Sequence, residues 1–492
     1  MKYIICRRAF HSKCCTFFNN RVTLTKSRTD VNSFPPRLAL VLLFRSFNRL
    51  NLFRPRAILK NMPNYFRVKI DSMAFRGYGV SRIAGKVIFI PYSVTGEEGW
   101  VEIVEEKKSY SMGRLLEILK PSSWRVDPPC PYFGVCGGCQ WQHIDYSKHG
   151  ELKKDIIKEI LIRLGGLKDA PSVDVEPSPD PYGYRTRVQL KVQGKALGYY
   201  QERSHQLVNI ERCPIAHPLV NEMIPLLRNA FPSFSQLQEI EINISPEEGK
   251  GIFILHSQKL NQRLEKIVKG SLQNLPVLKG LAIQGKRRAV MLGEPHLNFT
   301  IHLDQHRGER NLTLRASPGS FSQVNLKQNE NLIQKVLEFS DAEGNERTLD
   351  LYAGVGNLTL PLAMVSKQVW GIEENLVAVK DARSNLENNG IKNCSLIHGK
   401  VEDVLENWKW ENPDLLVLDP PRTGGKRALE QAVRLKPEKI VYVSCEPTTL
   451  ARDIRLLSNR GYALRGLALI DMFPQSFHME VIGLLMHPQT KV

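Results

Sequence analysis

The sequence predicts an α/β protein whose C-terminal part is a parallel, doubly wound sheet. Beyond about residue 347, short apolar and β-branched runs alternate with helical patterns, with glycine or polar turns between them. This alternation is typical of a parallel sheet with helices on both faces. Two more observations complete the fold class: glycine-broken β-runs between Phe66 and Leu119, and three cysteines within residues 130–139. They predict a small OB-like β-barrel and a central α+β domain with a cysteine site.

These patterns divide the chain into four parts. Residues 1–61 form a basic leader, 62–121 the OB-like barrel, 122–316 the central domain and 317–492 the doubly wound domain. Barrels of the OB type often bind nucleic acid. The central domain begins with the cysteine segment, and a helical pattern follows it from Glu151 to Leu164.

The leader carries most of the net charge of +18. It holds 13 Lys/Arg and one acid, Asp30, whereas the rest of the chain holds 55 basic and 49 acidic residues. Such a leader is typical of an organellar transit peptide; a gene start assigned too far upstream, with the true start at Met62, explains it as well. Its apolar run 38–44 is far shorter than the roughly 20 residues that span a bilayer. We therefore expect no membrane segment, and a location in a bacterial-type cytoplasm, or in an organelle if the leader is a transit peptide.

Ligands of a parallel sheet bind at the carboxyl ends of its strands, so the residues after each apolar run are the candidates for a site. The first run ends in a glycine loop, DLYAGVGN at 350–357, which lets a ligand approach the backbone. Glu373 ends the second strand, where a carboxylate accepts hydrogen bonds from ribose hydroxyls. Thr359 stands where a dinucleotide fingerprint has its third glycine. The pattern therefore favours S-adenosylmethionine over a dinucleotide.

The fourth strand ends in a rigid turn, Asp419-Pro-Pro-Arg422. Such a turn suits a group-transfer site at which a planar base meets a cofactor. In amino-group methyltransferases the fourth position is usually aromatic and stacks on the base. Arg422 therefore argues against methylation of an exocyclic amine.

Cys445 follows the fifth strand, and Glu480 opens the last one, EVIGLLM. Taken alone, Cys445 reads as a buried core residue and Glu480 as a solvated strand end. Together at the ligand edge they supply a nucleophile and a base. A thiolate that adds to C6 of uracil makes C5 nucleophilic toward a sulfonium methyl group. A base must then remove the C5 proton before the thiolate leaves.

The cysteines of the central part indicate metal binding in a reducing compartment. Cys130, Cys136 and Cys139 have the spacing C-x5-C-x2-C. Four thiolates hold either tetrahedral zinc or a [4Fe–4S] cluster. Zinc ligands usually come as two close pairs, whereas this segment is a triplet.

The combination of DLYAGVGN, LDPPR, VYVSCEP and DMFPQSFHME, with SQVN at 322–325, resembles the RNA 5-methyluridine methyltransferases. In detail it resembles the 23S ribosomal RNA (uracil-5-)-methyltransferases of the iron–sulfur type, over about residues 63–488. The resemblance implies a Rossmann-like class I domain that depends on S-adenosylmethionine, and an N-terminal TRAM domain that binds RNA. It implies that Cys445 is the nucleophile and Glu480 the proton acceptor. The cofactor contacts that it implies are Gln323, Tyr352, Gly354, Asn357, Glu373 and Asp419. The ligands that it implies for a [4Fe–4S] cluster are Cys130, Cys136, Cys139 and Cys213. We expect this cluster to be structural and to position RNA, because methyl transfer needs no electrons.

Two positions depart from the family pattern. Glu446 follows the nucleophile where relatives have Asn or Asp, which puts the local turn in doubt. Lys400 stands where several relatives have an Asn near the adenine, which puts that contact in doubt.

Ribosomal RNA is the expected partner, because the transfer RNA branch of the family generally lacks the cluster. The enzyme must extrude the uridine from its stack. Candidates to line its path, for which an ordinary strand surface is an equal explanation, are Tyr184, Arg185, Arg187, Tyr199 and Tyr200. Three other functions stay open: a transfer RNA uridine or other pyrimidine C5 methyltransferase, a non-catalytic RNA-binding factor, and an NAD oxidoreductase with an iron–sulfur cluster. We expect a monomer.

Overall fold

The computed structural model describes residues 14–18, 21–25, 64–230, 237–257, 265–266, 269–270, 275–285, 289–303 and 310–487. The chain divides into two compact units, Met1–Tyr65 and Phe66–Val492. In the first unit, β1 (Cys14–Phe18) and β2 (Arg21–Thr25) pair as an antiparallel hairpin. The rest of the predicted leader lies outside the described residues. No helix in the described part of the chain is long and apolar enough to cross a membrane.

Six strands form the N-terminal sheet, in the order β3-β7-β8-β6-β5-β4. Their bounds are β3 (Tyr65–Lys69), β4 (Ser72–Ala74), β5 (Tyr78–Ile83), β6 (Lys86–Ile90), β7 (Glu98–Glu106) and β8 (Tyr110–Lys120). Alternation along the strands buries Ile70, Ile90 and Val101 in a small core. Gly77, between β4 and β5, has a φ of +80°, and an added Cβ would lie 2.5 Å from Trp141 Nε1. Glycine therefore allows this β-rich domain to approach the segment that follows the cysteines.

The central domain is built on a second sheet, in the order β12-β11-β10-β13-β14-β15-β16. Its strands are β10 (Arg187–Gln193), β11 (Ala196–Tyr200), β12 (Leu207–Asn209), β13 (Leu237–Ser245), β14 (Lys250–Ser257), β15 (Leu278–Gln284) and β16 (Ala289–Gly293). Helix α4 (Pro218–Ala230) buries Val220, Met223 and Leu227 against this sheet. A separate hairpin, β17 (Leu297–Leu303) and β18 (Arg310–Ala316), leads to the last part of the chain.

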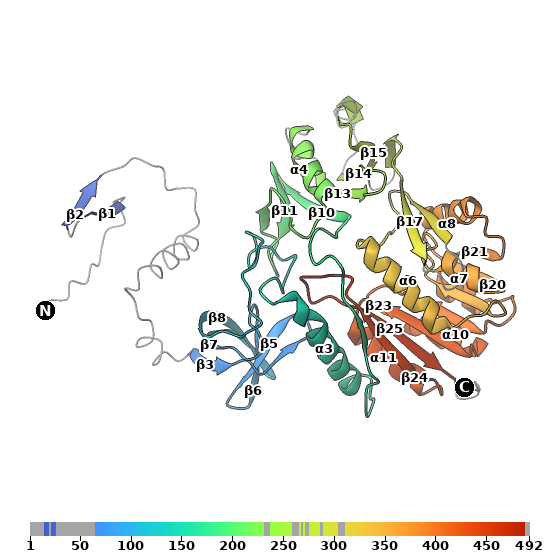
Figure 1. The fold of residues 1–492 in the computed structure, drawn as a ribbon, viewed down its shortest axis with the longest axis horizontal. Helices are drawn as coiled ribbons and strands as arrows, with labels where there is room; N and C mark the ends of the chain where they lie inside the picture. The colour runs from blue at the N-terminus through green and yellow to red at the C-terminus, as the bar shows by residue number, and fades with distance from the viewer. Residues whose placement is uncertain are drawn as a thin grey trace. The chain divides into compact units, whose positions relative to one another are not determined.

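The C-terminal part is an eight-stranded sheet, in the order β21-β20-β19-β22-β23-β25-β24-β9 (Figure 1). Its strands are β9 (Asp174–Glu176), β19 (Arg347–Leu351), β20 (Gln368–Glu373), β21 (Cys394–His398), β22 (Leu415–Leu418), β23 (Lys439–Ser444), β24 (Ala463–Ile470) and β25 (Glu480–Met486). Its helices are α3 (His149–Arg163), α6 (Leu326–Ser340), α7 (Thr359–Val365), α8 (Leu376–Asn388), α9 (Val401–Glu406), α10 (Lys426–Ala432) and α11 (Pro447–Ser458), with 3-10 turns η1 (Tyr146–Lys148) and η3 (Val433–Leu435). The alternation read from the sequence thus forms a sheet that is mostly parallel, whereas a parallel sheet was predicted.

Two features of this sheet depend on long-range pairing. Strand β25 lies between β23 and β24 and runs antiparallel to both. Its first residue therefore lies at the edge where the parallel strands end. Strand β9 comes from within the predicted central domain, 122–316, yet it pairs in parallel with β24. Residues on both sides of the predicted boundary at 316 therefore contribute to one sheet.

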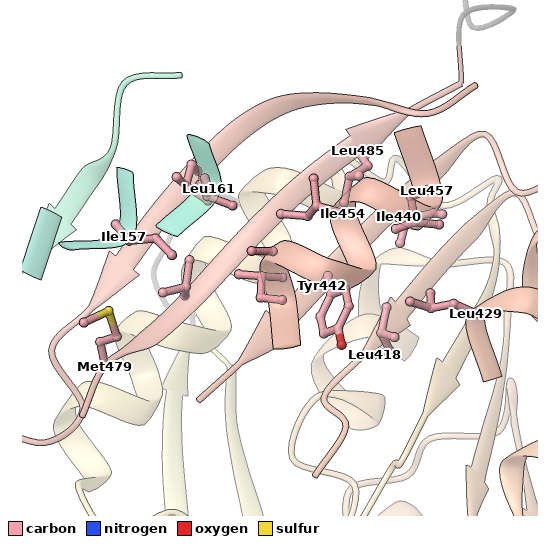
Figure 2. Close-up of a cluster of buried hydrophobic side chains, with 14 of the residues drawn as sticks. Ile157, Leu161, Leu418, Leu429, Ile440, Tyr442, Ile454, Leu457, Met479 and Leu485 are labelled. Carbon is pink, nitrogen blue, oxygen red and sulfur yellow. The ribbon is translucent and has the colours of Figure 1, made fainter. Parts of the chain in front are cut away.

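One hydrophobic core lies beneath a face of this sheet (Figure 2). Ile157 and Leu161 of α3 belong to the same cluster as Ile454 and Leu457 of α11. Removing one such side chain to Ala typically costs about 2–5 kcal/mol of folding free energy. The polar tip of Tyr442 in this core is satisfied, because its hydroxyl donates to Asp453 Oδ2 at 2.7 Å. The cluster also holds Trp141, Ile144 and Met73, so the N-terminal domain and the C-terminal sheet share one core.

Candidate active site and four-cysteine site

The glycine loop after β19 has an unusual backbone. Tyr352, Gly354 and Gly356 all have positive φ angles, of 67°, 57° and 93°. Only glycine adopts this region without cost, so the non-glycine Tyr352 is held in a sparsely populated conformation. A Cβ at Gly356 would lie 2.3 Å from a side-chain carbon of Leu360. The loop therefore turns tightly into α7, as a ligand-cradling strand-to-helix turn requires.

Glu373 lies beside this loop, as predicted for the end of the second strand. Its carboxylate accepts the N–H of Gly354 at 2.9 Å and the N–H of Asn375 at 2.7 Å. The Asn375 side chain in turn caps α8 through the N–H groups of Val377 and Ala378. The carboxylate is thus fixed in place, and its remaining lone pairs are available to a ligand's hydroxyls.

The side chains of Asp350 and Asn357 hold the glycine loop in place through hydrogen bonds. Asn357 and Asn329 of α6 exchange reciprocal amide hydrogen bonds of 2.8 Å. Asp350 is 1% exposed and accepts a hydrogen bond of 2.5 Å from the Thr359 hydroxyl. Burial raises the pKa of Asp350 to about 7. These contacts make Asp350 and Asn357 part of the scaffold of the loop.

Gln323 lies just before α6 and is 9% exposed. The backbone at this point is tied to the central domain, because the carbonyl of Val324 accepts both the N–H and the hydroxyl of Thr186. The loop that carries Gln323 therefore has a fixed position between the central domain and the C-terminal sheet.

Cys445 and Glu480 come from neighbouring antiparallel strands. Ser444, the last residue of β23, pairs with Val481 of β25. Continuing that register by one residue places Cys445 opposite Glu480. Asp419 directly follows the adjacent strand β22, and its N–H points to the carbonyl of Leu351 at 3.4 Å. The structure thus brings the predicted nucleophile, the predicted base and Asp419 to one edge of the sheet.

The electrostatics of this edge favour the uncharged forms. Burial, with smaller contributions from the charges of Glu480 and Asp419, raises the pKa of Cys445 to about 12. Burial also raises the pKa of Glu480 well above its ordinary value, with a contribution from Asp419. Arg422 opposes both shifts, through its charge on Glu480 and through its charge and a side-chain hydrogen bond on Cys445. A ligand that brings positive charge to this edge would favour the thiolate and the carboxylate together.

Four cysteines of the central domain also come together, although they are far apart in sequence. Cys130, Cys136 and Cys139 interact electrostatically with one another and with Cys213. Burial raises the pKa of Cys136 to about 11 and that of Cys139 to about 12. Bound metal cations would reverse this shift, because they stabilise thiolates.

The loop of Cys213 is held by backbone and side-chain contacts. The Asn221 amide accepts the Cys213 N–H at 2.8 Å and donates to the Cys213 carbonyl at 3.0 Å. The Tyr132 hydroxyl accepts the N–H of Glu211 at 3.0 Å, which joins the two cysteine segments. These contacts fix the sulfurs as a preformed set of soft donors.

The spacing of the sulfurs bears on the group that they fit. Among the described residues, which include all four cysteines, no three of these sulfurs lie within 4.8 Å of one another. Zinc with Zn–S bonds of 2.3 Å draws four sulfurs to roughly 3.8 Å. The four sulfurs therefore do not have the spacing of a closed zinc site.

A group of Glu239, Glu241 and His256 on the central sheet also has ligand atoms within 4.8 Å of one another. Its carboxylates already face cations: Lys191 contacts Glu239, and Arg187 lies 2.8 Å from Glu241. The group is therefore an ion-paired network on the sheet face.

The aromatic and basic residues proposed to line an RNA path have different environments. Tyr184 is 6% exposed, and its hydroxyl donates to the Pro474 carbonyl, so it is a core residue and this part of the prediction is wrong. Tyr199 packs against the core of the central domain. Tyr200 is 36% exposed. Arg187 lies over the ring of Phe321, which is 57% exposed and which the sequence reading did not single out.

In sequence, the chain is similar to RNA methyltransferases. The family model described as tRNA (Uracil-5-)-methyltransferase matches residues 145–411 and 404–488. A protein of Aquifex aeolicus named as an uncharacterized RNA methyltransferase is 35% identical over 439 residues, which cover 87% of this chain and 99% of that protein. The 23S rRNA (uracil(1939)-C(5))-methyltransferase RlmD of Pectobacterium atrosepticum is 33% identical over 453 residues, which cover 90% of this chain and 98% of that enzyme.

A solved structure has a similar fold. The Pyrococcus abyssi tRNA (uracil-54, C5)-methyltransferase, in complex with S-adenosyl-L-homocysteine, matches with a TM-score of 0.68 and 25% sequence identity. The match covers 85% of this chain and 99% of that one. The two chains share an α/β methyltransferase fold.

Proposed function

The chain belongs to the tRNA (uracil-5-)-methyltransferase family, and from that premise we propose that it methylates C5 of a uridine in large-subunit ribosomal RNA, with Cys445 as nucleophile and Glu480 as base. Family membership makes the chain an RNA uracil-C5 methyltransferase that depends on S-adenosylmethionine. The ribosomal substrate and the roles of individual residues are the proposed part. The observation that carries the roles is the placement of Cys445 opposite Glu480 across β23 and β25.

The reaction needs a thiolate, an electrophilic methyl group and a base, in that order. The Cys445 thiolate adds to C6 of the uracil, and the electrons of the C5–C6 double bond move toward O4. Bound S-adenosylmethionine would supply the methyl group that C5 takes. The Glu480 carboxylate then accepts the C5 proton, the double bond forms again, and the S–C6 bond breaks to release Cys445.

The charges of the site fit this sequence of events. Without ligand, burial raises the pKa values of Cys445 and Glu480 and so favours the protonated form of each group. A sulfonium ion beside Asp419, together with Arg422, would stabilise both conjugate bases. The enzyme thus forms its nucleophile and base when the methyl donor is bound.

The residues around the glycine loop fit a nucleoside cofactor. Glu373 is positioned to accept ribose hydroxyls, and the positive-φ turn at Tyr352 and Gly354 leaves the backbone open to a ligand. Gln323 lies in the turn before α6. Asn357, the last residue of the glycine loop, is hydrogen-bonded to Asn329 of the same helix. Asp419 would face the charged end of the cofactor.

Two proposals concern the remainder of the chain. The N-terminal β-rich domain, residues 62–121, acts as a TRAM-type RNA-binding module, which its six-stranded sheet supports. The four cysteines would hold a [4Fe–4S] cluster, which the mutual electrostatic interactions of the four thiols and their lack of zinc-like spacing support. Its role is to position RNA-binding segments, because methyl transfer needs no electrons. Loss of methyl transfer upon one-electron reduction or oxidation of an otherwise intact cluster would count against that role.

Tritium release tests the chemistry and the substrate class together. Anaerobically purified protein is incubated with S-adenosylmethionine and with unmodified ribosomal or transfer RNA labelled at uracil C5, and Cys445→Ala is the control. We expect release from ribosomal RNA only, abolished by the substitution. Release from transfer RNA alone would keep the chemistry and overturn the substrate, in line with the Pyrococcus abyssi structure. No release from either RNA, with the cluster intact, would favour a non-catalytic RNA-binding factor.

A further inference from the structure

The segment 471–479 joins β24 to β25 and ends directly before Glu480; we call it the base loop. It contains neither helix nor strand, and Gln475 has a positive φ of 67°. A loop with such a backbone keeps its shape only when its surroundings hold it. The position of the Glu480 carboxylate therefore depends on what holds the base loop.

Donors from three distant parts of the chain bind the carbonyls of the base loop. The Gln475 carbonyl accepts the N–H groups of Gln140 and Trp141, each at 3.1 Å. The Pro474 carbonyl accepts the hydroxyl of Tyr184 at 3.1 Å. The Met472 carbonyl lies 3.4 Å from the amide nitrogen of Asn325, and the Phe473 carbonyl accepts the Ser476 hydroxyl at 2.9 Å.

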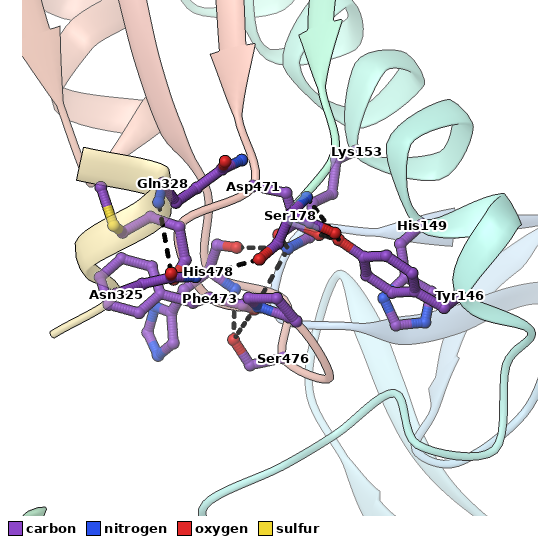
Figure 3. A network of polar contacts seen from close by, with 12 residues as sticks. Tyr146, His149, Lys153, Ser178, Asn325, Gln328, Asp471, Phe473, Ser476 and His478 are labelled. Carbon is purple, nitrogen blue, oxygen red and sulfur yellow. Dashed lines mark hydrogen bonds and ion pairs between the residues drawn. The ribbon is translucent and has the colours of Figure 1, made fainter. Parts of the chain in front are cut away.

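Lys153 of α3 binds both ends of the base loop (Figure 3). Its ammonium group is fully buried and lies 2.6 Å from Asp471 Oδ1, at the start of the loop. The same ammonium donates to the carbonyl of His478 at 2.6 Å, two residues before Glu480. A third contact, of 3.4 Å, reaches the carbonyl of Phe473. The three N–H donors of one ammonium group are thus matched by three acceptors of the loop.

Asp471 has a second anchor. The Tyr146 hydroxyl donates to Asp471 Oδ2 at 2.9 Å, and it also accepts the N–H of Ser178 at 2.7 Å. The carboxylate is 1% exposed, so both of its oxygens find their partners inside the protein. The buried ion pair Lys153–Asp471 therefore joins α3 to the base loop in a fixed position.

Stability alone does not account for this ion pair. Moving two charges out of water costs free energy, and well-packed apolar residues of similar volume often stabilise a core as well or better. An apolar pair, however, would leave the His478 carbonyl without its donor. The feature specific to Lys153 is that it joins the two ends of one loop at a set distance.

We propose that Lys153 is a positioning residue that places Glu480 for removal of the C5 proton. The inference rests on the proposed function, in which Glu480 is the base. Lys153 acts through the backbone of the base loop and touches no reacting atom. Its loss should affect the step that uses Glu480, and should leave the earlier attack by Cys445 and the methyl transfer largely intact.

The order in which bonds form and break predicts which intermediate accumulates when Glu480 is displaced. After methyl transfer the RNA is still joined to the enzyme through the S–C6 bond. Glu480 takes the C5 proton, the C–H electron pair forms the C5–C6 double bond again, and the S–C6 electron pair returns to sulfur as thiolate. A displaced base stops this step, so methylated RNA remains covalently attached to Cys445.

The test uses the full chain with its metal site loaded. Lys153→Met alone leaves Asp471 charged in the interior without its partner, so the double variant Lys153→Met/Asp471→Asn, neutral at both positions, is the main subject. Arg163→Met is the matched control, because Arg163 is a cation of the same helix with a 70% exposed side chain. Lys153→Arg and Glu480→Gln complete the set.

Single-turnover reactions with labelled RNA report the denaturant-resistant enzyme–RNA adduct and the released methylated RNA. For the double variant we expect the adduct to rise at least about fivefold over wild type and product release to fall about 10²-fold, the size typical of a lost general base. The KM for RNA should stay within about twofold. Glu480→Gln should show the same pattern, and adding it to the double variant should cause little further loss, because both affect one step.

Several outcomes separate this inference from the proposed function. Adduct and product falling together in the double variant, or both remaining at the wild-type level, would refute the role of Lys153. Rescue of release by Lys153→Arg, with its retained charge, would support it. Absence of both a Cys445-dependent adduct and methylated RNA in wild type and in Arg163→Met would refute the proposed function instead.

Discussion

The chain contains two thiol sites that differ in the charged groups around their sulfur atoms. Cys445 lies among carboxylates, with Arg422 as a cationic contact, and burial raises its pKa to about 12. The four cysteines of the central domain have chiefly one another as charged neighbours, and burial raises their pKa values too. In the first site an arginine and a bound sulfonium would produce one reactive thiolate. In the second, the proposed metal centre would supply the positive charge that stabilises four thiolates. Burial alone therefore does not distinguish a nucleophile from a ligand, whereas the source of compensating charge does.

The largest effect expected from this comparison is that of Cys445→Ala. The variant should lose turnover by about 10³-fold or more, because among the described residues no other thiol lies opposite Glu480. Its metal content should equal that of wild type. Methyl transfer assays measure the loss of turnover, and iron analysis measures the metal content. An appreciable rate of methyl transfer in this variant would show that a different residue attacks C6.

Cys136→Ala tests the other site. Loss of one of four ligands should remove the bound iron and sulfide, and should lower the thermal unfolding midpoint by about 10 °C, because metal binding is coupled to folding. Iron, acid-labile sulfide and zinc determinations on anaerobic protein provide the measurement, with Cys394→Ala as the control for a cysteine outside both sites. Stoichiometric zinc without iron in wild type would contradict the cluster proposal.

Arg422→Met sharpens the electrostatic part of the comparison. Arg422 lowers the pKa of Cys445, so its removal should raise that pKa further. Only the thiolate reacts with iodoacetamide, and at pH 8 its fraction falls tenfold for each unit by which the pKa rises. We expect alkylation of Cys445 in cofactor-free protein to slow by about tenfold. The exposed Arg427→Met, on the neighbouring helix, should leave the rate unchanged; equal slowing in both variants would refute the assignment.

Asp350 provides the smallest test, on stability. Its folded pKa of about 7 lies above its ordinary value, so the protonated form favours folding. This contribution is complete below about pH 4 and is lost as the pH rises toward 7. Asp350→Asn keeps a neutral acceptor for Thr359, so its unfolding midpoint should fall less than that of wild type between pH 5 and pH 8, by about 5 °C. If the unfolding midpoints of wild type and Asp350→Asn fall by the same amount between pH 5 and pH 8, Asp350 is ionised in the folded protein.

Local pattern was sufficient to predict much of this molecule. The strand–helix alternation, the glycine loop and the acid at the end of β20 depend on residues close in sequence, and the structure has them where they were predicted. The pairing of β25 between β23 and β24, which makes Glu480 a partner of Cys445, depends on long-range register. The predicted roles of Cys445 and Glu480 remain to be tested by experiment.

Lys153 and Tyr184 show what local pattern did not reveal. A lysine within an amphipathic helix ordinarily points to solvent, and the partner of Lys153 is 318 positions away. Tyr184 precedes a strand and suits an exposed aromatic surface, yet the base loop covers it and uses its hydroxyl. Neither environment follows from local pattern, because the residues of the base loop that contact Lys153 and Tyr184 come from the far end of the sequence.

The antiparallel placement of β25 has a consequence for biosynthesis. On the ribosome the chain emerges from its N-terminal end, so Cys445 and the parallel strands are available before Glu480. The sheet then has an open slot between β23 and β24, which only β25 fills. Until this late strand inserts, a nascent chain holds Cys445 without Glu480 opposite it. The pair Cys445–Glu480 is therefore complete only when the last strand of the sheet is in place.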